Sequence, residues 1–214
     1  MNASAWERWS PLSGIVSVVL LLVGLFMGQL PGGADSDQKM ANYVNDHGHR
    51  VTMSISAYVM VFGALAFLWF LGSLRTRLLA AEGMPARVTT IAFSAGVTVV
   101  ILLIVMAGSE GAMVSPISFG KEHSVGPSIS YIGWFGVWAF IFAMLAAAAL
   151  AIAVAAVAFR TRVFARWLVW LSVLAAIVLL FSFAFLPAIA FVIWTVAVSI
   201  AMVRPGPVAA TPPA

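Results

Sequence analysis

Six ionisable side chains that could bind a metal or exchange protons flank the apolar parts of this chain. They are Asp46, His47, His49, Glu110, Glu122 and His123. Imidazole and carboxylate groups suit Zn²⁺ or another divalent ion, and histidine changes its charge near neutral pH. His-x-His alone is a weak signal, and solvated loop residues are the alternative. If the six side chains converge, we expect a metal-binding or proton-sensing site there.

The elements that position these residues are long stretches without Asp, Glu, Lys, Arg or His. The stretches are Trp9 to Ala34, Val51 to Leu74, Val88 to Ser109, Ser124 to Phe159 and Trp167 to Val203. Each exceeds the roughly 20 apolar residues that a helix needs to cross a bilayer. Hydrophobic residues make up 63% of the chain and charged residues 8%, against about 45–50% and 25% in soluble domains. The sequence therefore predicts an integral membrane protein.

Two of the stretches are too long for one crossing. Pro187 lies at the centre of the last one and removes a backbone donor, so we expect a break near Phe185 to Pro187. A re-entrant hairpin is the alternative to two crossings. The stretch from Ser124 begins with loop residues, and its helix is expected from about Tyr131.

The prediction is an all-α transmembrane bundle of six helices, a single domain over residues 1–204. The expected spans are 10–30, 51–74, 88–108, 131–159, 167–185 and 188–203. The first is interpreted as a retained helix and not as a cleaved signal, because its apolar part exceeds the usual 7–15 residues. Residues 205–214 are expected to be a disordered, proline-rich tail.

The basic residues divide unequally between the two sides of such a bundle. One side receives Arg8, Arg75, Arg77, Arg87, Arg160, Arg162, Arg166 and Arg204, and the other receives Lys39, Arg50 and Lys121. Cytoplasmic loops carry the excess of Lys and Arg in membrane proteins. Both termini are therefore predicted to be cytoplasmic, and the six candidate site residues extracytoplasmic.

The outer connection before the second span has a helical pattern. Ser36 can cap a helix in which Met40, Val44 and His47 recur on one face, and Gly48 can end it. We expect a short helix at the level of the outer headgroups, with an ordinary polar loop as the alternative.

Within the expected spans the sequence places hydroxyl groups and small residues but no ionisable residue at depth. The hydroxyls are expected to bond within the bundle. Gly24 with Gly28, and Ala92 with Gly96, form small-xxx-small pairs, and the fourth span is rich in alanine. Such surfaces predict close helix packing, centrally or against another subunit. Most of the tryptophans are expected at the membrane interfaces.

Composition excludes several functional classes. The chain has no cysteine, which rules out disulfides, thiol catalysis and cysteine-held metal centres. Its net charge of +4 is spread over several loops, which does not favour nucleic-acid binding. The chain contains no phosphate-binding glycine loop and no hydrolase or protease motif, so no cofactor is predicted.

Three segments carry a resemblance to known proteins. They are Trp9 to Gly14 at the start of the first span, the acidic segment Asp35 to Asp46, and Phe67 to Arg75 at the end of the second span. In these features the chain resembles a group of small bacterial multipass proteins of the domain-of-unknown-function type. The resemblance covers about the first half of the chain. It implies a bacterial inner (plasma) membrane setting and supplies no active site.

We therefore expect a non-enzymatic membrane protein that binds a lipid or an apolar small molecule, or serves as a membrane partner subunit. Its partners are expected to be membrane lipids, together with either a second copy of the chain in a homo-oligomer or a membrane partner subunit that packs on the small-residue faces. A small transporter or channel is the first alternative and requires a continuous polar path of hydroxyls. A membrane enzyme is the second, and it requires the His/Asp/Glu residues to lie within reach of one metal.

Overall fold

The computed structural model describes residues 10–31, 36–181 and 186–203, and these residues form an all-helical bundle. The elements in chain order are η1 (Ser10–Leu12), α2 (Ser13–Met27), α3 (Asp37–Asn45), α4 (His47–Glu82), α5 (Arg87–Ser118), η2 (Pro127–Ile129), α6 (Ser130–Thr161), α7 (Arg166–Leu180) and α8 (Leu186–Val203). The predicted all-α class is confirmed. The tail expected over residues 205–214 lies outside the described residues.

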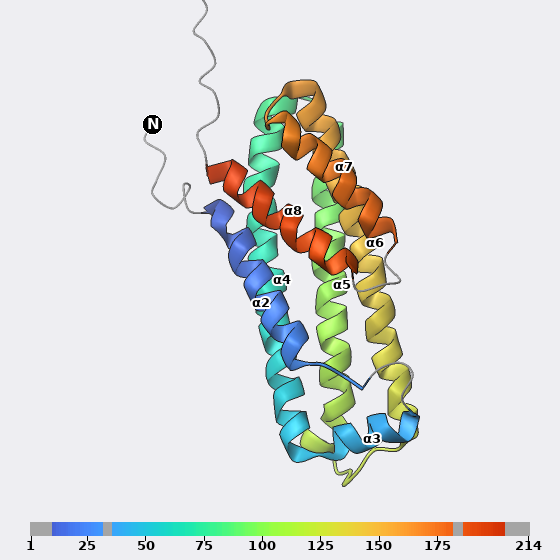
Figure 1. Cartoon of the computed structure of the whole chain (residues 1–214). Coiled ribbons are helices and arrows are strands. Elements are labelled where there is room, and N and C mark those ends of the chain that lie inside the picture. Colours follow the sequence, from blue (N-terminus) through green and yellow to red (C-terminus); the bar gives the residue numbers. More distant parts are fainter. Residues whose placement is uncertain (1–9, 32–35, 182–185, 204–214) are drawn as a thin grey trace, which may run out of the picture.

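Three long helices, α4, α5 and α6, lie side by side and form the body of the bundle (Figure 1). Helix α2 packs along α4, α7 runs back along α6, and α8 crosses from α7 to α2. Helix α3 lies across the end of the bundle at which α4 begins. We call this the α3 end, and we call the opposite end, which carries Arg75, Arg77, Arg87 and Arg160, the arginine end.

Four helical segments within the described ranges are long and apolar enough to cross a membrane, namely Ser10–Met27, His47–Glu82, Arg87–Ser118 and Pro127–Thr161. Helices α4 and α5 extend beyond the spans predicted at 51–74 and 88–108. Those predictions place the ends of the spans at the nearest charged residues. A charged residue does not by itself end a helix, because its backbone N–H and C=O groups can still form the helical hydrogen bonds. A charged residue therefore indicates a change in the surroundings of the helix and not its end.

The last apolar stretch is divided into two helices, as predicted. Helix α7 ends at Leu180 and α8 begins at Leu186, with 15 and 18 residues respectively. Pro187 lies in the first turn of α8, where its missing backbone N–H is tolerated. Residues 182–185, which include part of the expected break, lie outside the described residues.

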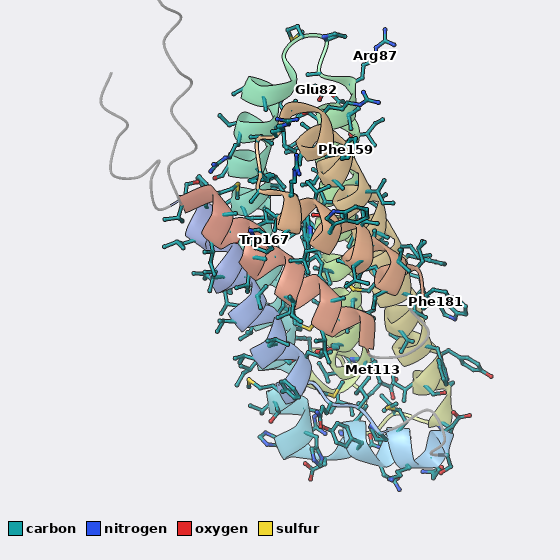
Figure 2. All side chains as sticks on the ribbon, turned by 45° about the horizontal axis from the view of Figure 1, so that its top comes forward. Glu82, Arg87, Met113, Phe159, Trp167 and Phe181 are labelled. Carbon is teal, nitrogen blue, oxygen red and sulfur yellow. The ribbon has the colours of Figure 1, made fainter. Side chains whose placement is uncertain are left out.

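The outer surface of the bundle is largely apolar. Phe159, Trp167 and Phe181 are labelled in Figure 2 and are 76%, 55% and 72% exposed. Large exposed apolar side chains also recur along α2, for example Val19 and Phe26. Surfaces of this kind are rare on soluble monomers and mark contact with lipid or protein.

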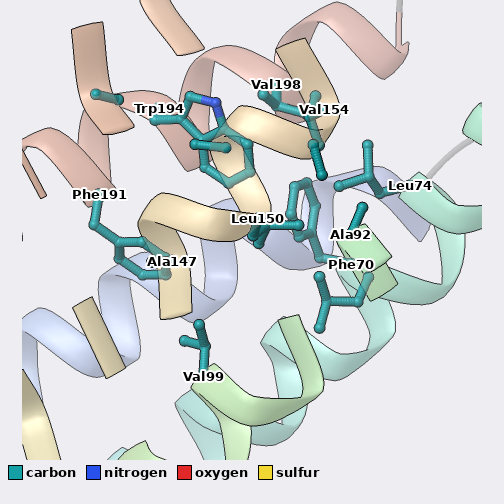
Figure 3. Close-up of a cluster of buried hydrophobic side chains, with 14 of the residues drawn as sticks. Phe70, Leu74, Ala92, Val99, Ala147, Leu150, Val154, Phe191, Trp194 and Val198 are labelled. Atoms are coloured by element: carbon teal, nitrogen blue, oxygen red, sulfur yellow. The ribbon is translucent and has the colours of Figure 1, made fainter. Parts of the chain in front are cut away.

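Aromatic and aliphatic side chains from α4 and α8 meet the alanine-rich α6 in the core (Figure 3). Trp194 is fully buried there, and its indole Nε1 donates a hydrogen bond to the Ser172 hydroxyl at 2.9 Å. Ser172 in turn donates to the carbonyl of Leu168 at 2.8 Å. Trp194 therefore joins α7 to α8 and is not an interfacial residue, whereas Trp69 and Trp170 are exposed on the surface of the bundle.

Small residues allow the helices to approach closely, as predicted. A Cβ atom built on Gly24 would collide with Met60 Cγ, and one on Gly96 would lie 2.5 Å from a Leu71 methyl group. In α6, many alanines, including Ala143, Ala147 and Ala151, are buried between α5 and α7. The alanine-rich helix thus packs within the chain's own bundle.

At the arginine end, Glu82 connects α4 to α5. Its carboxylate accepts hydrogen bonds from the backbone N–H groups of Val88 at 3.0 Å and Thr89 at 2.7 Å, and from the Thr89 hydroxyl at 2.6 Å. These bonds satisfy donors in the first turn of α5 that have no partner within the helix. Gly83 ends α4 with a φ of 70°, which favours glycine.

We expect Gly63→Val to destabilise the bundle by about 1–3 kcal/mol, the usual cost of overpacking. A Cβ on Gly63 would lie 2.9 Å from Leu21 Cγ and 3.1 Å from the Leu21 backbone nitrogen, so α2 would have to move. Gly72→Val is the matched control on α4, because nothing lies within 4 Å of its Cβ position. Denaturant unfolding of both variants in detergent micelles, followed by circular dichroism, measures the difference. Equal stability of the two variants would contradict the described packing of α2 on α4.

Candidate functional site at the α3 end of the bundle

The six residues singled out from the sequence belong to the α3 end, but they do not all come together. Asp46 separates α3 from α4, and His47 and His49 lie in the first turn of α4. Glu122 and His123 are exposed in the connection after α5, whereas Glu110 lies inside α5 and is only 4% exposed. Within the described residues, which include all six, no group of three or more His, Asp or Glu side chains could hold a metal ion. The six side chains therefore do not form one metal-binding group in the described residues, and Glu110 is separated from the exposed residues by its burial in α5.

Asp46 and His49 have a structural role at the start of α4. The Asp46 carboxylate accepts a hydrogen bond from the backbone N–H of His49 at 2.9 Å and lies 3.2 Å from His49 Nδ1. The backbone hydrogen bond is the main cause that lowers the pKa of Asp46 below its ordinary value. The His49 ring also stacks on Tyr43, with centroids 3.9 Å apart. These contacts order the corner between α3 and α4.

Helix α3 was predicted correctly, apart from its end. Ser36 caps it by accepting a hydrogen bond from the Lys39 backbone N–H at 3.3 Å. The helix ends at Asn45 and not at Gly48, because Asp46 adopts an extended conformation and caps the next helix instead. The Arg50 guanidinium donates to the carbonyls of Val44 at 3.3 Å and Asn45 at 2.5 Å, which satisfies the C-terminal end of α3.

A pair of side chain to backbone bonds joins α3 to the connection between α5 and α6. The Asn45 amide donates to the carbonyl of Val125 at 3.1 Å and accepts from the Val125 backbone N–H at 2.8 Å. Below this pair, Ala41 and Val44 are fully buried against Met53 and Met113. No sequence pattern indicates this contact, because its two halves are 80 positions apart.

Glu110 is the functional candidate that the sequence analysis placed wrongly. The sequence predicts a loop position after the third span for Glu110, and no ionisable residue at depth within the spans. In the structure α5 continues to Ser118, and the Glu110 carboxyl group lies between α2 and α4. The recurrence of Met106, Glu110 and Met113 on one helical face is the signal that the helix continues past the charge.

The surroundings of the Glu110 carboxyl are tightly packed. The Ser56 hydroxyl lies 2.8 Å from Glu110 Oε2 and 2.9 Å from the carbonyl oxygen of Gly24. A Cβ atom on Gly28 would lie 2.8 Å and 2.9 Å from the two carboxyl oxygens. Burial, followed by the charges of Glu110 and Asp46, raises the pKa of Tyr43 on α3. The carboxyl group therefore lies in a junction of α2, α4 and α5 with Tyr43 near it.

One turn away from Glu110, an apolar crevice lies between α2, α4, α5, α6 and α8. Its walls include Leu22, Leu25, Met60, Met106, Phe140, Met144 and Phe191. Its volume is about 40 Å³, well below the roughly 300–1,000 Å³ of typical small-molecule pockets. The crevice suits a slender apolar chain better than a bulky ligand.

No family model, no curated protein and no solved structure matches this chain.

We expect Asn45→Ala to release the connection between α5 and α6. The variant loses both bonds to Val125, each worth about 0.5–1.5 kcal/mol, so the connection should open more often. Trypsin should then cut after Lys121, which is exposed in that connection, faster than in the unaltered protein. Mass spectrometry of limited digests in detergent measures the rate. The control is Asn42→Ala, an exposed α3 residue that bonds only to Gln38 in the described residues; equal cleavage in the two variants would contradict the role of Asn45.

Proposed function

We propose that this protein is a non-enzymatic, six-crossing membrane protein of the bacterial inner membrane. In this proposal it binds an acyl chain or a similarly slender apolar molecule in the crevice of α2, α4, α5, α6 and α8. The observation that carries the proposal is the lining of the crevice, which is entirely apolar. A chain taken from the bilayer gains no hydrophobic free energy, because lipid is as apolar as the crevice, so its retention would depend on van der Waals contact with the walls.

The composition of the walls supports a chain-like ligand. Met60, Met106 and Met144 come from three different helices. Methionine is unbranched and adapts to irregular apolar surfaces, which suits a ligand without a fixed shape. The hydroxyls of Thr52, Ser54 and Thr98 return hydrogen bonds to carbonyls of their own helices, which favours structural roles for them over a transport path.

The six crossings and the cytoplasmic termini are part of the same proposal. The concentration of arginines at one end of the bundle supports this orientation. Arg77 there donates to the carbonyl of Met202 at 2.6 Å, so the end of α8 lies at the arginine end as well. Helices α7 and α8 reach only part of the way along α6 (Figure 1), so a re-entrant hairpin is the competing arrangement.

We expect Leu22→Trp to weaken binding of an apolar chain by at least about tenfold, or ~1.4 kcal/mol, because the indole would fill the crevice. Val19→Trp is the matched control, since Val19 lies on the same helix, is 53% exposed and is not part of the crevice. The measurement is titration of each purified variant with a fluorescent fatty acid, together with mass spectrometry of lipids that copurify. Unchanged binding in Leu22→Trp, or equal loss in both variants, would overturn the proposed site.

We expect a cysteine at position 181 to be labelled from outside the cell. The chain has no cysteine of its own, so single substitutions can be read without background. With a membrane-impermeant maleimide on intact cells, Phe181→Cys and Lys121→Cys should react, and Arg162→Cys should react only after permeabilisation. Labelling of Lys121→Cys but not of Phe181→Cys would support the re-entrant hairpin. Labelling of Arg162→Cys in intact cells would reverse the orientation.

A further inference from the structure

Glu110 forms part of a three-helix junction that neither the crevice nor the α3 contacts require. Its carboxyl group is contributed by α5, the Ser56 hydroxyl by α4, and the Gly24 carbonyl by the last turn of α2. Glu110 is 4% exposed and Ser56 is fully buried. An ionisable group buried in a membrane-length helix is costly to keep charged and is commonly functional.

The distances restrict where the hydrogen atoms can lie. The Ser56 hydroxyl has one hydrogen, but acceptor oxygens lie 2.9 Å away on Gly24 and 2.8 Å away on Glu110. The Gly24 carbonyl oxygen cannot donate and already accepts from the Gly28 backbone N–H at 2.8 Å. The single hydrogen of Ser56 can be shared between the two acceptors only in a weaker three-centre bond. Both contacts can be full two-centre hydrogen bonds at once when Glu110 is protonated and donates to Ser56, while Ser56 donates to Gly24.

The groups that face Glu110 give its ionised form little support. Helix α2 presents its C-terminal end, where the free carbonyls carry partial negative charge. Helix α3 presents Tyr43, on which His49 of α4 stacks. The Arg50 guanidinium of α4 is directed to the carbonyls of Val44 and Asn45.

Helix α6 presents glycines to the same region of α5. Gly136 lies against Ser109, and Gly133 lies against Met113. Neither residue carries a group that could neutralise a carboxylate.

We propose that Glu110, Ser56 and the Gly24 carbonyl form a proton-binding site that fastens the end of α2 to α4 and α5. With the proton bound, a continuous run of hydrogen bonds links the three helices. When the proton leaves, the Ser56 hydroxyl turns to the carboxylate, its bond to α2 is lost, and the carboxylate faces the negative end of α2. The end of α2 then separates from α4 and α5.

This site adjoins the proposed ligand crevice. Leu25 in the wall of the crevice follows Gly24 directly, and Met60 and Met106 lie one turn from Ser56 and Glu110. Resting on the proposed function, the inference is that proton loss at Glu110 loosens the α2 wall and releases the apolar chain. The proton site itself can be tested without any ligand.

The test is infrared spectroscopy of the full chain in vesicles of a diether phosphatidylcholine, whose chains carry no ester carbonyl that would absorb near the carboxyl band. At neutral pH, where exposed carboxyls are ionised, the unaltered protein should show the C=O stretching band of a protonated carboxyl group, and the band should shift in D₂O. Glu110→Gln should lack the band, and Glu122→Gln, which alters an exposed carboxyl, should retain it. Ser56→Ala should shift its frequency, because the acceptor of the carboxyl proton is removed. A missing band in the unaltered protein, or a band that persists in Glu110→Gln, would overturn the site.

A spin label on Phe26→Cys reports the movement of α2, since Phe26 is 66% exposed and lies two residues after Gly24. Alkaline pH should make this label more mobile, and the change should be lost when Glu110→Gln is added, because the amide keeps donating to Ser56 at every pH. A label on Phe142→Cys of α6, also exposed, should not respond. Equal pH responses with and without Glu110→Gln would overturn the coupling to α2.

The outcomes separate the two proposals. If fatty acid binding is independent of pH and the spin label does not respond to pH, the ligand site stands. Control of the α2 wall by the proton on Glu110 is then contradicted. If the carboxyl band and the spin label both respond to pH but no fatty acid binds, the proton site stands. Binding of an apolar chain in the crevice is then contradicted.

Discussion

The close packing of α2 on α4 is the contact on which the rest of the structure depends. Because lipid offers no hydrophobic driving force between helices, association depends on contact area and on polar bonds between helices. Gly24 and Gly63 bring the two backbones together, and the Ser56 hydroxyl reaches the Gly24 carbonyl because no side chain intervenes. The crevice, the contact of α8 with α2 and the position of Gly28 over Glu110 all follow from where α2 lies.

Polar side chains at both ends of the bundle serve mainly to complete the helices. Glu82 caps α5, Asp46 caps α4, and Arg50 satisfies the end of α3. Ionisable side chains near helix ends therefore need not indicate a catalytic or metal site. Glu110 differs from them because it is buried and its neighbours are a hydroxyl and a glycine, not the end of its own helix.

The sequence predicted which segments are apolar helices, because a run of about 20 residues without charge is typical of a helix that lies in hydrocarbon. It also predicted α3, because Ser36 caps this helix and Val44 lies on its buried face. Both features depend on the residues of this segment alone. It failed where charge was used to locate the end of a helix. The prediction of a loop at Glu110 is wrong for that reason, since α5 continues to Ser118.

Contacts between distant segments could not be predicted from the sequence, because they depend on the tertiary arrangement of the helices. The burial of Trp194 depends on how α7 and α8 fold back on α6, and the Asn45 to Val125 bonds depend on which connections meet at one end. Neither leaves a periodic signal in the sequence. The same holds for Ser56, which has the same residue type as the hydroxyls that bond only to their own helix.

The unequal helix lengths have a consequence for the surrounding bilayer. The apolar segment Ser10–Met27 has 18 residues, and α6 has 32, so at 1.5 Å per residue they extend about 27 Å and 48 Å. Lipids next to α2 would contact a short apolar surface, whereas lipids next to α6 would contact a longer one. A tilt of the whole molecule, or local thinning on one flank and thickening on the other, relieves this mismatch at a modest energetic cost per ångström. The bilayer would then be deformed unequally around the circumference of the protein.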